Sequence, residues 1–296
     1  MKPNPEFLKV DLEFWANVKL LNQRLGYTER KSVKIPNPGF KVPTATNIRK
    51  VFKEEELRVS KILLNDKFTE FGQRLVEYMT YRGQVLTDEV KPMLMNKEQA
   101  RALFYQLKEQ FNPSCPLPMN KQKNEKKDYA FMTGIVNMII ERYKGDLDCD
   151  YDPRELTAMT ENSFPIRTLS RRVDGAFPSV IDPVAVWEIK EYYYTTTFGS
   201  RVADGVYETQ LDGWELQEAR ETLDRNIDHY LIIDDYNTWW NMGRSYLCRI
   251  IDLLHMGLVT EVLFGKEVVD RLPDIVQKWT SRYEGEGDAP RLAAEP

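Results

Sequence analysis

The stretch Val184-Ala185-Val186-Trp187-Glu188-Ile189-Lys190 places two charged side chains in a run that is otherwise apolar and favourable to β structure. Because side chains alternate between the two faces of a strand, Trp187 and Ile189 point one way while Glu188 and Lys190 point the other. Opposite charges on a buried or half-buried strand cost desolvation free energy. We therefore take Glu188 and Lys190 as candidates for a chemical site.

The spacing Glu-x-Lys is not informative alone, since it recurs at Glu29/Lys31, Glu89/Lys91 and Glu125/Lys127. Those three triplets stand in polar or turn-like surroundings, where opposite charges two residues apart indicate a solvated surface. The triplet at Glu188 differs because it follows an aspartate at a suitable distance. Asp174 stands just before Gly175, and thirteen residues separate it from Glu188. A hairpin of that length would bring the two carboxylates together.

Two carboxylates at the edge of a sheet are a suitable ligand set for a hard cation such as Mg²⁺. Hydrolysis of a phosphodiester needs an aligned water and relief of the charge that builds on the phosphate oxygens. A nearby lysine can orient the water and stabilise that charge. We predict Asp174, Glu188 and the backbone carbonyl of Ile189 as metal ligands, with Asp174, Glu188 and Lys190 as catalytic residues.

Asp174 followed by Glu188-Ile189-Lys190 on an apolar strand, and then by a capped helix, resembles the PD-(D/E)XK superfamily of restriction-endonuclease-like nucleases. The resemblance extends from about Tyr129 to Ile233. It implies an α/β fold with an αβββαβ core, in which helices flank a mixed sheet. It also implies magnesium dependence and hydrolysis of DNA to 5′-phosphate ends. Val173 stands where the motif has proline.

The same resemblance points to two further catalytic candidates by position. Glu141, on a helix before the first core strand, would be an extra metal ligand, and the alternative is an exposed carboxylate paired with Lys144. Gln210, on the helix after the lysine strand, corresponds to a glutamine of some branches. Its alternative is an ordinary helix residue outside the site.

Basic residues beside the motif are candidates for binding the phosphates of DNA. Three arginines flank the proposed site, and three lysines belong to the polar run over residues 120–128, which we otherwise expect to be a solvated loop. These six candidates are Arg171, Arg172, Arg201, Lys123, Lys126 and Lys127.

Hydrophobic periodicity predicts the order of the elements. In the first part we expect helices over residues 8–25, 51–82 and 96–111. In the second we expect a helix over 129–143, strands over 164–173 and 184–194, a helix from Ser200 to about Arg225, a strand over 229–233, a helix over 243–255, a strand over 262–264 and a helix over 268–279. Gly175 and Pro178 belong to an expected turn, and the acidic stretch 146–152 to a loop.

We expect three regions along the chain. Residues 1–120 form a helical region for DNA recognition or dimerisation. Residues 121–283 form the nuclease core with C-terminal helices, and residues 284–296 a disordered tail.

The bulk composition restricts the classes of protein. The 296 residues carry 41 Lys and Arg against 46 Asp and Glu, a net charge of −5 that argues against a simple DNA-packaging role. Three scattered cysteines favour neither a disulfide framework nor a zinc site, and only two histidines are present. Apolar runs stay well short of the roughly 20 residues that span a bilayer, and the first residues lack the apolar core of a signal peptide. We expect a cytoplasmic protein without a membrane partner.

The leading hypothesis is a metal-dependent deoxyribonuclease, a magnesium-dependent endonuclease of the restriction or phage-defence type that acts on double-stranded DNA. A homodimer is the simplest way to cut both strands, because two sites are then related by a two-fold axis. One alternative is a structure-specific or exonucleolytic DNA-repair nuclease. The other is an inactive nuclease-like DNA-binding module, in which Glu188 and Lys190 form only a salt bridge.

Overall fold

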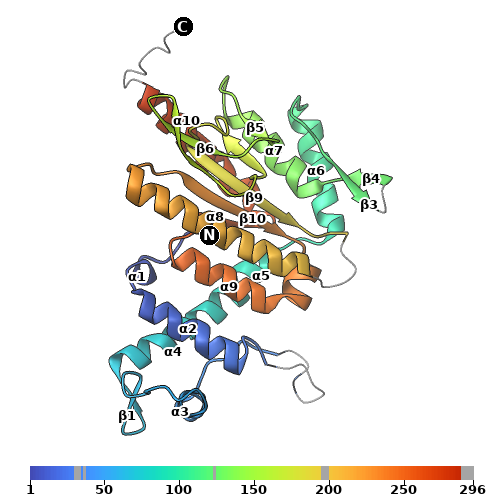
Figure 1. The fold of residues 1–296 in the computed structure, drawn as a ribbon. Coiled ribbons are helices and arrows are strands. Elements are labelled where there is room, and N and C mark those ends of the chain that lie inside the picture. The colour runs from blue at the N-terminus through green and yellow to red at the C-terminus, as the bar shows by residue number, and fades with distance from the viewer. Residues whose placement is uncertain (30–34, 36–37, 123–124, 195–199, 288–296) are drawn as a thin grey trace.

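A five-stranded mixed sheet lies at the centre of the computed structural model, which describes residues 1–29, 35, 38–122, 125–194 and 200–287 (Figure 1). The strand order is β11 (Glu261–Phe264), β10 (Asp228–Asp234), β9 (Ala185–Glu191), β8 (Gly175–Phe177) and β5 (Asp150–Tyr151). The first three strands are parallel, whereas β8 runs antiparallel to β9 and β5 antiparallel to β8. The expectation of a mixed α/β fold is confirmed at this level.

Helices cover both faces of this sheet because the strands bury apolar side chains on each side. One face packs against α6 (Lys97–Phe111), α7 (Phe131–Tyr143) and α10 (Glu267–Gly287) through Trp187, Ile189 and Ile232. The other face packs against α8 (Ser200–Leu223), α9 (Arg244–His255) and the π-helical turn η2 (Asn237–Met242), through Leu231 and Ile233. Helix α6, expected within the N-terminal region, therefore shares its core with α7 and the sheet.

The N-terminal residues form a helical unit below the sheet in Figure 1, with a core of its own. Its helices are α1 (Pro5–Leu8), α2 (Leu12–Leu25), α3 (Ala45–Glu54) and α4 (Glu70–Val85). Asp11, Thr44 and Thr69 each accept a hydrogen bond from a backbone N–H of the first turn and so begin α2, α3 and α4. Helix α4 continues through the π-helical turn η1 (Leu86–Val90) into α5 (Lys91–Met93), which leads to the sheet.

A buried polar network joins the N-terminal unit to α9. The Nη1 atom of Arg82 donates to both carboxylate oxygens of Asp252, at 2.8 and 3.0 Å, and its Nη2 donates to Asn22 at 3.1 Å. The hydroxyl of Tyr78 donates to the same aspartate at 2.5 Å. All four residues are buried, so the two parts of the chain share a desolvated ion pair.

The helix predicted over residues 51–82 is wrong, because two helices stand there with a short hairpin between them. Helix α3 ends at Glu54 and α4 begins at Glu70, and the hairpin pairs β1 (Leu63–Leu64) with β2 (Lys67–Phe68). Asn65 and Asp66 form the turn with positive φ angles of 47° and 62°. These residue types tolerate the left-handed region, which an apolar periodicity does not reveal.

The strand predicted over residues 164–173 is also wrong as a core strand. Residues of β7 (Phe164–Thr168) pair with β6 (Ala158–Glu161) in a separate ribbon, where Phe164 is 71% exposed. The core strand is instead β8, at Gly175–Phe177, inside the expected turn. Strand β8 has only three residues, all buried, and that is too short for an alternating pattern to be visible.

Three smaller expectations also change. The polar run near residue 120 contains a hairpin, β3 (Met119–Gln122) with β4 (Glu125–Tyr129), and not a plain loop. Part of the acidic loop pairs as β5. Helix α10 continues to Gly287, past the expected start of the tail at residue 284, and residues 288–296 lie outside the described residues. The other predicted helices and strands are present within a few residues of their expected ends.

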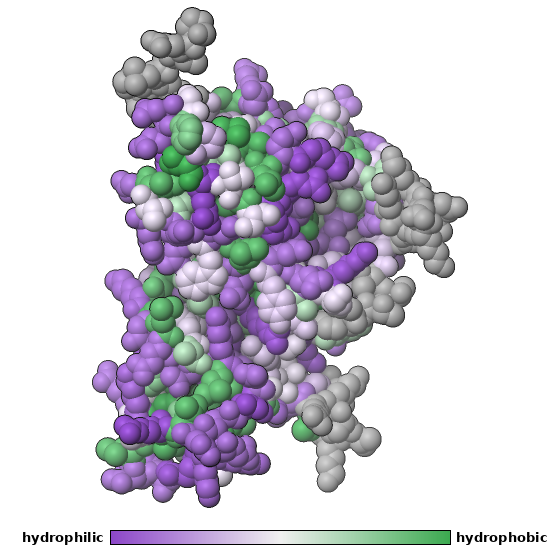
Figure 2. Space-filling view, in the orientation of Figure 1, coloured by the Kyte–Doolittle hydropathy of each residue, from purple (hydrophilic) through white to green (hydrophobic). Residues whose placement is uncertain are grey.

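Across the described ranges, no helix combines the length and apolar character needed to cross a membrane. The face shown in Figure 2 is mainly hydrophilic, with smaller apolar patches on both the N-terminal unit and the part that holds the sheet.

Candidate functional site

Strand β9 presents Glu188 and Lys190 to α8, on the opposite face from its aromatic residue, whereas Glu191 at its end accepts a hydrogen bond from the N–H of Thr133 on α7. Trp187 stacks on Trp279 of α10, with ring centroids 5.4 Å apart and planes 8° apart. Glu188 and Lys190 occupy the alternate positions and are 0% and 9% exposed. The alternation that the sequence predicted for this strand is therefore the observed one, and the charges are desolvated.

Glu188 lies at the centre of a network of ion pairs. Its Oε2 accepts a hydrogen bond from Nζ of Lys190 at 2.7 Å. The guanidinium of Arg171 approaches both of its oxygens, with Nη1 3.0 Å from Oε1 and Nη2 3.1 Å from Oε2. Burial alone would raise the pKa of Glu188, but the charges of Lys190 and Arg171 outweigh it and hold that pKa below its ordinary value.

Asp174 joins the site through the pairing of β8 with β9. Its backbone N–H donates to the carbonyl of Trp187 at 3.1 Å, and its Oδ2 accepts from the N–H of Ile189 at 2.7 Å. In a strand, the N–H and carbonyl of one residue point to the same side. The carbonyl of Ile189 therefore also faces the side of Asp174.

The ionisation of Asp174 reflects this crowding. Burial, followed by the negative charge of Glu188, raises the pKa of Asp174 to about 6, against opposing effects of Lys190 and the N–H of Ile189. Lys190 behaves in the opposite way. Burial would lower its pKa, but Glu188 and Asp174 raise it above the ordinary value, so Lys190 is a charged ammonium in this structure.

Helix α8 contributes acids that the sequence analysis did not single out. Glu208 accepts from Nζ of Lys190 at 2.7 Å, and Asp212 accepts from Nη1 of Arg171 at 2.6 Å. One turn further on, Glu215 accepts hydrogen bonds from the N–H of Ser170 and from Arg167. Positions i, i+4 and i+7 share a face of a helix. The spacing of these acids beside small or apolar residues is the sequence pattern that could have identified them as members of the site.

The ion-pair network around Glu188, called the carboxylate cluster below, contains more negative than positive groups. Asp174, Glu188, Glu208 and Asp212 provide four carboxylates, against the two cations Arg171 and Lys190. Burial raises the pKa of Asp212 to about 7, and its buried Oδ1 accepts no hydrogen bond from the described residues. A doubly charged cation would balance this excess, and carboxylate oxygens are the donors that Mg²⁺ prefers.

Two predicted catalytic residues lie away from the cluster. Glu141 stands near the C-terminal end of α7, where its carboxylate accepts from the N–H and hydroxyl of Ser114, and not from Lys144. Gln210 is on α8, but a step of two residues turns a helix by about 200°, which leaves it roughly 160° from the face of Glu208 and Asp212. The two acids, and not Gln210, face Lys190 and Arg171.

The predicted DNA-binding residues lie in different parts of the structure. Arg171 is within the cluster. Arg172 and Arg201 are exposed, and the backbone carbonyl of Arg201 accepts from the hydroxyl of Tyr192. Lys123 lies outside the described residues, and the backbones of Lys126 and Lys127 belong to β4.

The side chains alone do not form a complete set of metal ligands at this site. In the part of the chain that the structure describes, no group of three or more His, Cys, Asp or Glu side chains is arranged to hold a metal ion. The predicted ligand set is smaller, since Asp174, Glu188 and the Ile189 carbonyl provide two carboxylates and one backbone oxygen. This donor set fits a magnesium ion that keeps several waters.

Comparison with known families matches two models, both described as domains of unknown function. DUF7687 matches residues 95–279, which include the sheet and every residue of the cluster. DUF7690 matches residues 1–89, which form the N-terminal helical unit. No curated protein and no solved structure matches the chain.

Proposed function

This chain belongs to the family described as domain of unknown function DUF7687, and we propose that it is a magnesium-dependent deoxyribonuclease of the PD-(D/E)XK type. The observation that carries the proposal is the meeting of Asp174, Glu188 and Lys190 at one place on the sheet, across β8 and β9. The motif alone could not require this, because Asp174 immediately precedes β8 whereas Glu188 lies on β9.

The arrangement of the elements also supports the proposal. Chain order runs α7, β5, β8, β9, α8, β10, with the ribbon β6–β7 inserted before β8. Three antiparallel strands are followed by a helical crossover to a parallel strand, in the sheet order β10-β9-β8-β5. We take this order as support for the αβββαβ core that the resemblance implies.

Roles for the residues follow from their positions. Asp174, Glu188 and the carbonyl of Ile189 would hold Mg²⁺, which supplies charge neutralisation and an acidified water at a phosphodiester. Lys190, a charged ammonium held by Glu188 and Glu208, would bind a phosphate oxygen and orient the attacking water. Arg171 neutralises Glu188 and Asp212 in this structure. When a dication binds these carboxylates, the guanidinium of Arg171 would leave them and bind the phosphate.

The biological setting that we propose is a restriction or phage-defence endonuclease acting on double-stranded DNA as a homodimer. Exposed Arg172 and Arg201 would contact the DNA backbone around the site. Light scattering with size-exclusion chromatography tests the dimer, whose mass would be twice that of the chain.

The first prediction concerns cleavage. Incubation with plasmids of varied sequence and methylation should yield cut DNA with Mg²⁺ and none with EDTA. Glu188→Gln and Lys190→Met should each lower the rate by about 100-fold or more, because each removes a charge that the transition state needs. Glu89→Gln and Lys50→Met are the matched controls, since both side chains are exposed and outside the cluster.

Other outcomes would contradict the proposal in different ways. Cleavage that survives Glu188→Gln would show that another site is responsible. Attack on free ends or branched DNA alone would favour the repair-nuclease alternative. Binding of DNA without cleavage, under every metal and substrate condition, would favour the inactive binding module.

A further inference from the structure

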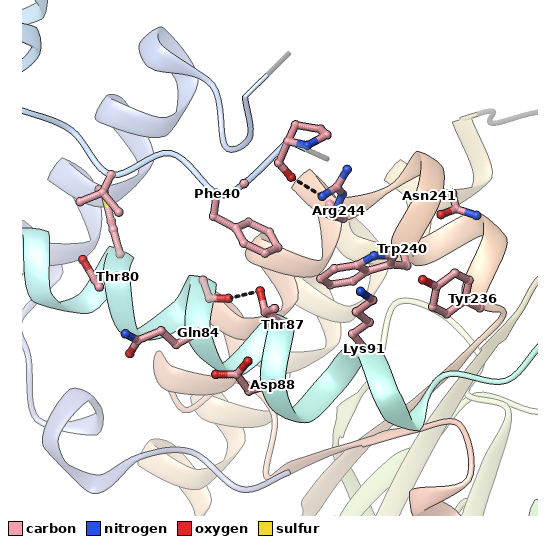
Figure 3. Close-up of a pocket in the computed structure, with 15 residues that line it drawn as sticks. Phe40, Thr80, Gln84, Thr87, Asp88, Lys91, Tyr236, Trp240, Asn241 and Arg244 are labelled. Atoms are coloured by element: carbon pink, nitrogen blue, oxygen red, sulfur yellow. Dashed lines mark hydrogen bonds between the residues drawn. The ribbon is translucent and has the colours of Figure 1, made fainter. Parts of the chain in front are cut away.

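A cavity of about 1010 Å³ lies between the N-terminal unit and the part that holds the sheet, away from the carboxylate cluster. Phe40, Thr80 and Gln84 line it from one side, and Tyr236, Trp240 and Arg244 from the other (Figure 3). A second cavity of about 730 Å³ shares Thr87, Asp88, Lys91 and Tyr236 with the first, so the two form one groove. Ligand sites of proteins are often found at such junctions.

Two cations are held against one indole in this cavity. Nζ of Lys91 and Cζ of Arg244 each lie 5.3 Å from the ring centroid of Trp240, and Figure 3 shows them on opposite sides of it. Arg244 is also fixed by its hydrogen bond to the carbonyl of Pro38, at 2.6 Å. Among the described residues, neither cation forms an ion pair with a carboxylate. They are two separate positions for an anion, and Arg244 is the more favourable one, because Asp88 lines the cavity three residues before Lys91.

The lining also contains groups that recognise a planar ring. Phe40 and Tyr236 offer aromatic surface, with Phe40 contacting Trp240 edge-on at 6.0 Å. Gln84 and Asn241 are exposed amides that can donate and accept hydrogen bonds at the edge of a base. An anion site beside aromatic surface and amides suits a phosphate attached to a heterocyclic base.

A second feature singles out the same cavity. Both π-helical turns of the described chain lie beside it: η1 supplies Thr87 and Asp88, and η2 supplies Trp240 and Asn241. Such turns are rare and occur often at functional sites, because the extra residue re-aims side chains at a cost in backbone geometry. The two turns come from different parts of the chain and converge on one space.

We propose that this cavity binds a nucleotide, with the phosphate on Arg244, on the side of the indole away from Lys91, and the base against Phe40, Tyr236 and the neighbouring amides. The ligand is a free nucleoside monophosphate or one nucleotide unit of a single-stranded nucleic acid. The site does not depend on the proposed nuclease chemistry, since it shares no residue with the carboxylate cluster.

Binding is tested by isothermal titration of the full chain, in EDTA, with AMP, GMP, CMP and UMP. We expect one of them to bind at one site per chain, and more tightly than inorganic phosphate, ribose 5-phosphate and the matching nucleoside. Arg244→Gln should raise the Kd at least tenfold, whereas Lys50→Met should leave it unchanged. Thr87→Trp, at an exposed position shared by both cavities, should block binding by filling the groove.

Several results would overturn the proposal. These are the absence of binding by all four nucleotides at millimolar concentration, equal affinity for ribose 5-phosphate, and unchanged affinity in the variant Thr87→Trp. Thermal unfolding of each variant checks that the fold persists, and Arg244→Lys, which keeps the charge, should retain more affinity than Arg244→Gln. Competition with a short single-stranded oligonucleotide then distinguishes a free nucleotide from a nucleotide unit of a nucleic acid as the ligand. Displacement of the nucleotide assigns the cavity to nucleic acid, and its absence assigns it to the free nucleotide; both agree with the proposal.

Discussion

Asp174 experiences two opposing environments. The N–H of Ile189 and the charge of Lys190 favour its carboxylate form, whereas burial and the charge of Glu188 oppose that form more strongly. A carboxyl group whose pKa is raised in the folded state contributes stability that is fully present below its unfolded pKa of 3.8. That contribution is lost as the pH rises towards about 6. At neutral pH, Asp174 therefore destabilises the metal-free protein.

We predict that Asp174→Asn raises the free energy of unfolding in EDTA at pH 7.5. The gain should be up to about 3 kcal/mol, since one pKa unit corresponds to about 1.4 kcal/mol. It should fall to roughly half that value at pH 5, because wild-type Asp174 is then largely protonated when folded. Asparagine can still accept the hydrogen bond from Ile189. Urea titrations of both proteins at the two pH values measure the difference.

The same pair of proteins tests the proposed metal. Added Mg²⁺ should stabilise the wild-type protein at pH 7.5, because a ligand that binds only the folded state favours it. The variant should gain less. A gain from Asp174→Asn that is equal at both pH values would refute the shifted ionisation, whatever the effect of magnesium.

Single residues of the site differ in how far the sequence reveals them. Glu188 and Lys190 are recognisable because charge interrupts an apolar run, and that contrast is local. The pairing of Arg171 with Asp212, 41 residues later, depends on how α8 crosses the sheet. No local pattern contains that information, so the sequence predicts Arg171 only as a DNA-binding residue and does not identify Asp212.

At the level of elements, the short strand β8 determines where Asp174 lies. Gly175 begins β8 and pairs with Trp187 of β9. A Cβ atom at this position would lie 2.1 Å from Cζ2 of Trp187, whose indole is buried and stacked on Trp279. Because this indole is 1% exposed and a contact of 2.1 Å requires it to shift, glycine is favoured at the start of β8.

We predict that Gly175→Ala lowers the free energy of unfolding by about 1–3 kcal/mol, as overpacking of a core does. It should also lower any DNA cleavage, because Asp174 moves with β8. The control is Gly285→Ala on α10, where an added Cβ meets nothing within 4 Å. Urea unfolding compares the two variants with the wild-type protein. A fully stable Gly175→Ala protein would contradict this account of β8.

Helix α6 and strand β9 could be predicted from the sequence because each has a regular local pattern. Helix α6 has both a regular apolar face and the cap Asn96, and β9 has seven residues, so each was recognisable from local pattern. Strand β8 and the hairpin β1–β2 are too short for that. Strand β8 depends on its partner Trp187 in β9, and the hairpin depends on the positive φ angles of its own turn at Asn65 and Asp66.

Across the whole molecule, the buried pair Arg82–Asp252 connects the regions matched by the two family models. Removing one partner leaves the other charge desolvated and uncompensated. We predict that Arg82→Met lowers the free energy of unfolding by about 3–5 kcal/mol. The double variant Arg82→Met/Asp252→Leu should recover much of that loss. Denaturant unfolding of both single variants and the double variant measures the coupling.

Both regions should then unfold together. Circular dichroism and tryptophan fluorescence should give one coincident transition in the wild-type protein. Two separated transitions would show that the pair does not couple the regions, even if each variant is destabilised.

The stacked pair Trp187–Trp279 makes β9 visible to spectroscopy. Two parallel indoles at 5.4 Å interact electronically, and their near-ultraviolet circular dichroism depends on the fixed packing of α10 against the strand. Trp187 is adjacent to Glu188 in sequence but lies on the opposite face of the sheet. An alteration of the carboxylates can therefore be distinguished optically from damage to the strand that carries them, in a sample without DNA or metal.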